Sequence, residues 1–406
     1  MAQGTKYIIL VGDGMADRPL KQLDDKTPLE VARTPNMDLM VKTGQIGRTL
    51  TIPNGLEPAS DVANLSILGY DPRKYYSGRG PLEAANMGIE LGEFDLAFRC
   101  NLVTAAGDIM ADYSAGHISS KEAAVLMSFL DEHLGKAHIK FYPGISYRHL
   151  MVIKPDVSYD IAQLKKLTTI PPHNILGQKI SKSLPKGEGA ETILRIMTES
   201  RAFLEKHEIN KVRLDLKENP ANMIWLWGQG SRPSMPSFRE RFGLTGAIIS
   251  AVDLVNGMGK IVGLEPIKVP GATGYYDTDY KAKAQYALKA LEEKDFVFVH
   301  VEAPDEAGHN GDVREKILAI ENFDAMVVGT MLKHFKDPRA YRMMVLPDHA
   351  TPIALRTHTD EPIPFAITGK DIAPGQYDTF SEKVSYESSL VYNEGWELMN
   401  FLTERK

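Results

Sequence analysis

The sequence has a single cysteine, Cys100, among its 406 residues. One cysteine excludes an internal disulfide framework and is typical of a protein in the reducing cytoplasm, where we expect this chain to work. The formal net charge is −6 and no basic run occurs, so we expect no nucleic-acid partner. No apolar run approaches membrane-spanning length and the N-terminus has no signal-peptide pattern, so we expect no membrane partner.

The length of the chain predicts a large core and two or three domains. Continuous apolar runs at Lys6–Val11, Phe296–Val299 and Met343–Leu346 predict strands that are buried on both faces. Helical patterns occur at about 279–293 and 313–334. We therefore predict the α/β class, with a core sheet covered by helices on both faces and formed by residues 1–80 and 240–406. Residues 81–239 have strand and helix patterns of their own and are predicted to form a smaller inserted α/β domain.

Local patterns predict several further elements. The apolar spacing of residues 27–44 predicts one helix, with Pro28 in its first turn. Asp95–Thr104 and Ile109–Ile118 have the composition of short strands. The capping-box pattern of Ser119 and Glu122 predicts a helix from Lys121 that ends at Gly135.

Acidic and imidazole side chains follow the predicted buried strands. Such positions lie where open α/β sheets form their sites, and carboxylate with imidazole is a ligand set for divalent metals. Any one of these residues could be structural; Asp13, for example, fits a loop that caps the next element. Together they are numerous enough for two metals, which suits a phosphoryl displacement. The residues are Asp13, Asp305, His309, Asp348, His349 and His358.

Ser60 precedes a helical run, so a helix beginning near Ser60 is predicted. A serine at this place is commonly just an N-cap. The alternative is a nucleophile at the positive end of the helix dipole, where a phosphate is also stabilised. Ser66 is a competing serine, but on a helix it points elsewhere. A metal next to Ser60 would favour the nucleophile interpretation.

Two other patterns suggest contacts to anions. Arg79 lies between two glycines in YYSGRGP, which fits a hinge, an anion contact or a surface turn. His117 follows small residues and projects either into a cleft or into solvent. Arginine forks bind phosphate and carboxylate in bidentate fashion.

A series of motifs along the chain carries a resemblance to a known family: VGDGMAD, DKTPLEVARTPNMD, SDVANLSILGYDP, YYSGRGPLEA, AFRCNLV, WLWGQG, PGATGYYDTDY, HVEAPDEAGH, PDHATP and RTHTDEPIP. Over nearly its whole length the sequence resembles the cofactor-independent (2,3-bisphosphoglycerate-independent) phosphoglycerate mutases of the archaeal type. These belong to the alkaline phosphatase superfamily. The resemblance implies an alkaline-phosphatase-like core and an inserted substrate-binding domain that closes over the site as a lid.

The resemblance also implies two divalent metal ions, manganese first and magnesium, cobalt or zinc as alternatives. The positions that match the ligands of one ion are Asp13, Ser60, Asp348 and His349. Those that match the ligands of the other are Asp305, His309 and His358. Ser60 matches the serine that becomes phosphorylated. His117 resembles a substrate-contacting histidine, and weaker matches for phosphate or carboxylate contacts are Arg79, Arg99, Arg148 and Arg232.

The implied reaction is the interconversion of 3-phosphoglycerate and 2-phosphoglycerate in glycolysis. Ser60 takes the phosphoryl group, glycerate reorients, and its 2-hydroxyl takes the group back, while water is excluded. The sequence departs from the family pattern at Ala59, where glycine is common. The YSAGHIS and SYRH motifs resemble a branch proposed to phosphorylate homoserine. A homoserine-kinase-like phosphotransferase and a phosphatase therefore stay open, and a non-catalytic, metal-stabilised binding protein is a third hypothesis.

Overall fold

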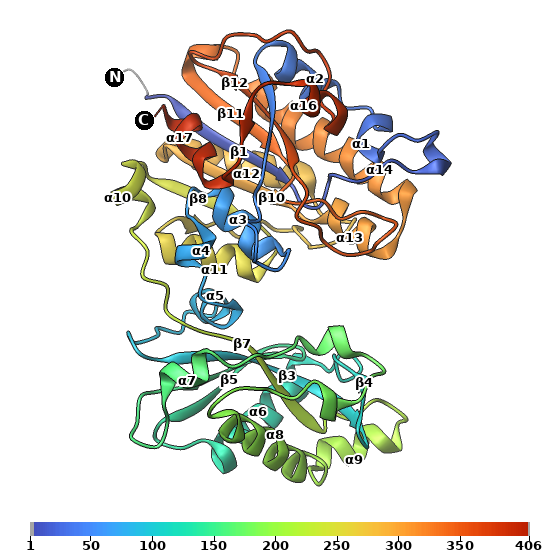
Figure 1. The fold of residues 1–406 in the computed structure, drawn as a ribbon, viewed down its shortest axis with the longest axis vertical. Coiled ribbons are helices and arrows are strands. Elements are labelled where there is room, and N and C mark those ends of the chain that lie inside the picture. The colour runs from blue at the N-terminus through green and yellow to red at the C-terminus, as the bar shows by residue number, and fades with distance from the viewer. Residues whose placement is uncertain (1–3, 405–406) are drawn as a thin grey trace. The chain divides into compact units, whose positions relative to one another are not determined.

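The computed structural model describes residues 4–404, which form two compact units (Figure 1). The first unit joins the described part of Met1–Tyr76 to that of Met235–Lys406, and the second is Ser77–Ser234. Each unit has its own sheet and its own apolar core. The α/β class predicted from the sequence is confirmed. Within residues 4–404, no helix combines the length and the apolar character needed to cross a membrane.

The sheet of the first unit has eight strands, drawn from both ends of the chain. In Figure 1 the blue β1 lies among the orange strands of the C-terminal half. The five strands from β11 to β9 are parallel, whereas β12 is antiparallel to both of its neighbours. In spatial order the strands are β13 (Val391–Tyr392), β2 (Gln45–Thr49), β12 (Ile363–Gly369), β11 (Tyr341–Leu346), β1 (Lys6–Gly12), β10 (Phe296–Val301), β8 (Gly246–Ile249) and β9 (Glu265–Pro266).

Helices cover both faces of this sheet. Alternate strand residues such as Leu10 and Val299 join α2, α12 and α14 in one apolar core. On the opposite face, Phe238 of α10 packs at 4.7 Å against the ring of Phe296, and α11 and α17 also contact strands. The α-helices are α1 (Pro28–Val31), α2 (Pro35–Lys42), α3 (Ser60–Ile67), α4 (Pro72–Tyr75), α10 (Phe238–Phe242), α11 (Asp253–Val262), α12 (Tyr280–Glu293), α13 (Ala303–Asn310), α14 (Val313–Asn322), α15 (Gly329–His334), α16 (Glu382–Glu387) and α17 (Leu398–Thr403). Helical segments of other types are the 3-10 helices η1 (Lys21–Leu23), η5 (Pro338–Ala340) and η6 (Gly395–Glu397) and the π-helical η4 (Phe323–Val328).

The single helix predicted over residues 27–44 is wrong, because the chain forms α1 and α2 with a break between them. Ala32 is extended, with φ −61° and ψ 143°, and Thr34 has φ −122° and ψ 53°. The cause is Pro35, since the ring of a proline disfavours the helical region for the residue before it.

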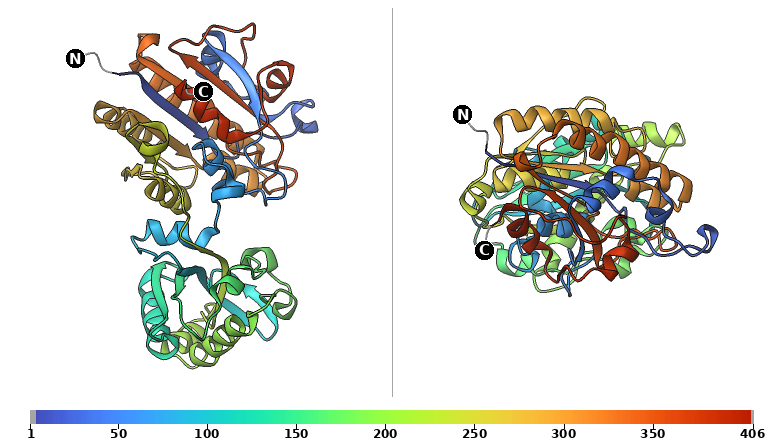
Figure 2. Two further views of the ribbon diagram at one scale, coloured as in Figure 1. Left: turned by 60° about the vertical axis from the view of Figure 1, so that its left-hand side comes forward. Right: turned by 90° about the horizontal axis from the view of Figure 1, so that it is seen from above.

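The second unit is a five-stranded antiparallel sheet with two long helices on one face. Figure 2 shows α6 and α8 beside each other, and both contribute to the larger core of this unit. The short α5 packs on the other face through Ala84. The elements are α5 (Arg79–Asn86), β3 (Leu96–Ala106), β4 (Ile109–Asp112), α6 (Ser120–Leu134), β5 (Ile139–Ile145), β6 (Arg148–Ile153), α7 (Ile161–Lys165), η2 (Pro172–Ile175), η3 (Ile180–Lys182), α8 (Ala190–Leu204), α9 (Glu208–Asp215) and β7 (Met223–Ser231).

The strand predicted over Ile109–Ile118 is too long, since β4 ends at Asp112. The Asp112 carboxylate accepts hydrogen bonds from the backbone N–H groups of Ser114 and Gly116. A side chain that bonds its own following backbone in this way favours a turn over a strand. His117 therefore lies in a turn, with φ 50°.

Candidate metal centre

The carboxyl ends of three neighbouring strands bring the candidate ligands together. The parallel strands β1, β10 and β11 are adjacent in the sheet. Asp13 directly follows β1, and Asp348 comes shortly after β11. Asp305 is on α13, which begins directly beyond β10. The site therefore lies at the sheet edge where α/β folds commonly place theirs.

The first cluster, here called the inner group, consists of Asp13, Asp348 and His349. One potential ligand atom from each lies within 4.8 Å of the other two, and all three residues are buried. The Nε2 atom of His349 lies 3.4 Å from Asp13 Oδ1 and 3.6 Å from Asp348 Oδ2. Imidazole nitrogen and carboxylate oxygen thus converge on one point.

Backbone and amide donors hold Asp348 in place. Its Oδ1 accepts from the N–H of Gly14 at 3.1 Å and from its neighbour His349 at 2.9 Å. Its Oδ2 accepts from Asn64 Nδ2 at 2.7 Å. By contrast, Oδ1 of Asp13 is buried and has no hydrogen-bond partner among the described residues. A buried carboxylate oxygen without a donor is costly, and a bound cation would satisfy it.

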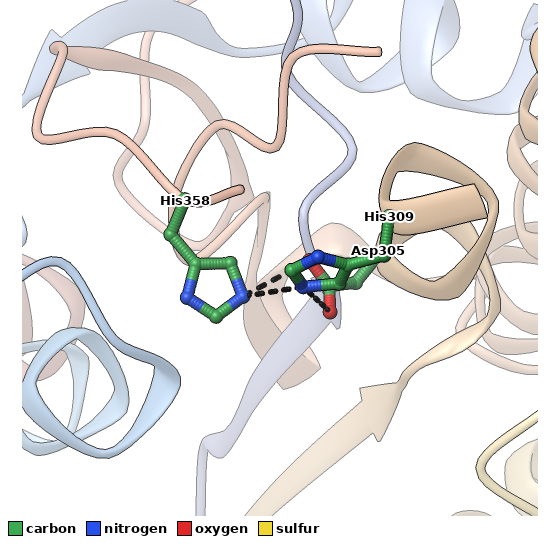
Figure 3. A group of neighbouring side chains, drawn as sticks. All are labelled: Asp305, His309 and His358. Carbon is green, nitrogen blue, oxygen red and sulfur yellow. Dashed lines mark hydrogen bonds and ion pairs between the residues drawn. The ribbon is translucent and has the colours of Figure 1, made fainter. Parts of the chain in front are cut away.

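The second cluster, here called the outer group, consists of Asp305, His309 and His358. Figure 3 shows the three side chains pointing toward one another, two from α13 and one from a loop. The Nε2 atoms of the two histidines are 2.9 Å apart. Asp305 lies 3.2 Å from His309 Nε2 and 3.5 Å from His358 Nε2. The His309 side chain keeps 34% of its surface exposed, so this group is more accessible than the inner one.

The other ring nitrogens of these histidines face acceptors. His309 Nδ1 lies 3.0 Å from the carbonyl oxygen of Arg356, and His358 Nδ1 lies 3.4 Å from that of Pro58. Donation from Nδ1 to a carbonyl leaves the Nε2 lone pair free for a ligand bond. The hydroxyl of Thr351 also donates to Asp305 Oδ1. This is the pattern expected around histidines that bind a metal.

The electrostatics of the buried carboxylates fit cation binding too. Burial and the charges of Asp348 and Asp305 raise the pKa of Asp13 well above its usual value. Burial lowers the pKa of His309, but the hydrogen bond and charge of Asp305 outweigh it and raise that pKa to about 9. Several acidic groups thus crowd one buried place and compete for positive charge. The two groups fit two divalent ions of a kind that oxygen and nitrogen ligands prefer.

Ser60 is the first residue of α3, and Ala59 is the N-cap. The helix therefore begins where the sequence predicts, but no side chain caps it. The Ser60 Oγ atom lies 3.1 Å from His349 Nε2. A hydroxyl is thus placed beside the inner group and at the positive end of a helix.

Comparisons with known proteins agree with the motifs. A family model described as 2,3-bisphosphoglycerate-independent phosphoglycerate mutase matches residues 41–210. A probable 2,3-bisphosphoglycerate-independent phosphoglycerate mutase from Geobacter sulfurreducens is 50% identical over 98% of this chain and 100% of its own length. The chain belongs to this family. A second relative, a mutase of the same description from Methanothermobacter thermautotrophicus, is 51% identical over 98% of this chain and 97% of its own length.

Two solved structures match the chain over almost its whole length. The PH0037 protein from Pyrococcus horikoshii matches with a TM-score of 0.83 and 30% identity, over 100% of this chain and 99% of its own. A cofactor-independent phosphoglycerate mutase from Thermoplasma acidophilum matches with a TM-score of 0.67 and 26% identity, over 98% of this chain and 99% of its own. Both cover the two units, so the inserted unit is a shared part of the fold.

The residues predicted to bind substrate all lie in the second unit. Arg79 and Arg99 both contact the ring of Trp227, with guanidinium carbons 5.5 and 4.6 Å from its centre. Arg99 is buried and pairs with Glu83 at 3.0 Å. The rings of His117 and Tyr147 are 6.2 Å apart. Arg148 is the first residue of β6 and lies against the ring of Tyr147. Arg232 directly follows β7 and is exposed.

The sequence predictions missed several buried polar residues behind the two groups. His300 lies within the apolar strand β10 and is fully buried. A histidine within such a strand is a signal that could have been noticed. Lys283 and Lys316 are both buried, on α12 and α14. Their positions in the sequence look like ordinary polar positions of amphipathic helices, so no sequence signal distinguishes them.

Proposed function

We propose that the protein interconverts 3-phosphoglycerate and 2-phosphoglycerate through a phosphoserine at Ser60. The observation that carries this proposal is the position of Ser60 Oγ, 3.1 Å from His349 of the inner group and at the first turn of α3. Family membership supports phosphoglycerate as the substrate and the glycolytic step as the setting. A cytoplasmic location fits the single buried cysteine.

The two groups would hold two divalent ions, for which we propose manganese first. When bound, such ions would lower the pKa of a nearby hydroxyl and neutralise the charge of a transferring phosphoryl group. The inner group would be completed by the Ser60 oxygen. No N-cap side chain caps α3, although the N–H of Val62 in its first turn donates to Asp61 Oδ1 at 3.1 Å. The positive end of the helix dipole is therefore available to a phosphoryl oxygen at Ser60.

The chemistry at the serine has two balanced halves. Ser60 loses its hydroxyl proton and its oxygen bonds to phosphorus, while the bond from phosphorus to the substrate oxygen breaks and that oxygen takes a proton. Glycerate then presents its 2-hydroxyl, which loses a proton and bonds to phosphorus as the Ser60 oxygen leaves. We further propose that the carboxylate of glycerate is held by His117 and by arginines among the four predicted ones, which are Arg79, Arg99, Arg148 and Arg232. Retention of glycerate separates a mutase from a phosphatase.

The direct test replaces Ser60 by alanine, with Ser66→Ala as the matched control. Ser66 is on the same helix and is fully buried, but no described residue hydrogen-bonds to its hydroxyl. Ser60→Ala should lower mutase turnover by at least about 1,000-fold while much of the manganese binding is retained. Ser66→Ala should keep turnover near the wild-type value. Full activity of the Ser60 variant would contradict the proposal.

Product analysis distinguishes the alternatives. The manganese-loaded protein is given 3-phosphoglycerate without 2,3-bisphosphoglycerate, and the products are followed by phosphorus NMR. We expect 2-phosphoglycerate, and we expect its formation to stop when a chelator is added. Free phosphate alone would show a phosphatase, and phosphate transfer only to added homoserine would show a different acceptor.

A further inference from the structure

The imidazole of His300 bridges the inner group and a carboxylate behind it. Its Nε2 lies 3.4 Å from Asp13 Oδ2 and 3.6 Å from Asp348 Oδ2. Its Nδ1 lies 3.2 Å from Glu302 Oε1. The ring is fully buried, so these neighbours take the place of water. The Nδ2 atom of Asn64 also lies 3.4 Å from the same Nε2. Ionised carboxylates only accept hydrogen bonds, so the ring is the donor toward Asp13, Asp348 and Glu302.

Both carboxylate oxygens of Glu302 accept hydrogen bonds from neighbouring groups. Lys283 Nζ donates to it at 2.6 Å, and the Ser250 hydroxyl and the Ala251 N–H donate at 2.8 and 2.9 Å. Lys283 also donates to the carbonyl oxygen of His300 at 2.9 Å. The orientation of the His300 ring is therefore fixed from behind by a buried ion pair.

The two candidate carboxylate ligands depend on His300 to different degrees. Asp348 has three donors from backbone and amide groups. For Asp13, the two oxygens differ: Oδ2 faces His300, whereas Oδ1 has no hydrogen-bond partner within residues 4–404. Holding one oxygen from behind leaves the other directed at the place where His349 Nε2 also points.

We propose that His300 is a positioning residue of the inner group. By donating to Asp13 Oδ2, it selects Oδ1 as the metal-binding oxygen and fixes its direction. This inference rests on the proposed metal centre, and it extends that centre to a residue outside the ligand set. Partners behind a ligand commonly change metal affinity by about 10–100-fold when they are removed.

The test measures manganese binding to the inner group alone. The full chain with His309→Gln and His358→Gln, which removes the imidazoles of the outer group, serves as the background. His300→Phe is added to it and binding is followed by calorimetry and by the electron paramagnetic resonance of free Mn²⁺. We expect inner-group affinity to fall by about 10–100-fold. In the reciprocal background, His349→Gln, outer-group affinity should stay within about twofold.

Two further variants separate positioning from simple packing. His149 is a buried histidine of the second unit whose Nδ1 accepts from the N–H of Gly144. His149→Phe should alter thermal stability without changing manganese affinity. His300→Gln keeps an amide donor in place of the imidazole and should recover part of the affinity, and it replaces the phenylalanine variant if that one does not fold.

The outcomes are distinguishable from those of the proposed function. A folded His300 variant with wild-type inner-group affinity overturns the positioning role and leaves the metal centre intact. A wild-type protein that binds no manganese or other divalent ion overturns both. A loss of affinity in His149→Phe equal to that in His300→Phe would also overturn the role, because the effect would then be general.

Discussion

The inner and outer groups have similar ligand sets but different surroundings. The inner group is fully buried, and its carboxylates are held by Gly14, Asn64 and His300. The outer group is completed by His309, which is partly exposed, and by His358, which comes from a loop. The inner group is thus formed by the sheet and the first turns after its strands, whereas the outer group opens toward solvent.

Each group nevertheless has a buried lysine–carboxylate pair behind it. Lys283 and Glu302, 2.6 Å apart, lie behind the inner group. Lys316 and Asp17, 2.7 Å apart, lie behind the outer group. Lys316 also donates to the carbonyl oxygen of Thr351 at 2.8 Å, whose hydroxyl donates to Asp305. The two ion pairs share no residue, so they can be tested one at a time. The Thr351 hydroxyl also lies 3.2 Å from Nδ1 of His349 in the inner group.

The largest effect is expected at Gly14, whose N–H donates to Asp348 of the inner group and whose backbone lies close to Asp305 of the outer group. Its φ is +59°, and an added Cβ would lie 2.5 Å from Asp305 Oδ1 and 2.8 Å from Asp305 Cα. Gly14→Ala should destabilise the protein by more than about 3 kcal/mol and abolish manganese binding at both groups. Urea unfolding and calorimetry check this. Gly274→Ala, where an added Cβ meets nothing within 4 Å, is the control and should stay within about 0.5 kcal/mol.

The two buried lysines should separate the groups. Lys316→Met leaves Asp17 without its buried cation and should cost about 3–5 kcal/mol of stability. In the folded fraction, manganese affinity should fall more at the outer group than at the inner one. Lys283→Met should show the reverse pattern. Manganese binding is measured in the His309→Gln/His358→Gln background for the inner group and in the His349→Gln background for the outer group. If either lysine variant lowers the manganese affinity of both groups equally, the two groups do not have separate supports.

Ion exchange should differ between the groups. Because His309 is partly exposed and the inner ligands are buried, we expect the outer ion to leave at least about tenfold faster into excess chelator. Stopped-flow chelation with a metal-sensitive dye resolves the two phases. The His309→Gln variant should lose the fast phase and keep the slow one. A single phase for both ions in the wild type would show that the groups are kinetically equivalent.

The smallest effect is expected at Glu382, which accepts from the N–H of Asp17 and from the Thr27 hydroxyl. Burial raises the pKa of Glu382 from its ordinary value of 4.5 to about 7. The folded state therefore holds a proton that the unfolded state releases. The stability from this group is full below about pH 4.5 and is lost as the pH rises through 7.

Glu382→Gln should remove this pH dependence. Between pH 5 and 8, the wild type should lose about 2–3 kcal/mol more stability than the variant. Urea unfolding in the presence of chelator measures the difference without a contribution from metal binding. Parallel stability curves for the two proteins would contradict the expectation.

The sequence predicted the ligand positions because strand ends can be read from apolar runs. Asp13, Asp305 and Asp348 follow such runs, and the parallel order of β10, β1 and β11 brings them together. Their role in metal binding stays a prediction, as do the phosphorylation of Ser60 and the substrate contacts. The buried lysine–carboxylate pairs were not predicted. Asp17 closes the VGDGMAD motif, but its partner Lys316 is far away in the sequence and nothing local distinguishes that lysine from a surface residue.

Two errors in the predicted helices have identifiable physical causes. The break between α1 and α2 follows from Pro35. The prediction relied on the helical spacing of apolar residues and did not take this proline into account. The helix predicted at about 313–334 exists, but it contains the π-helical η4. There the buried Asp324 accepts from the N–H of Met37 and from Asn36. A contact between segments so distant cannot be read from spacing alone.

The position of β1 in the sheet has a consequence for synthesis on the ribosome. β1 is translated first, but both of its neighbours, β10 and β11, are in the C-terminal part of the chain. At ~5–20 residues per second, it waits roughly 15–60 s for them. All strands of the second unit are complete before then. The nascent chain thus contains every strand of the second unit while the apolar β1 still lacks both of its neighbours. We expect β1 to be most accessible to a chaperone during this interval.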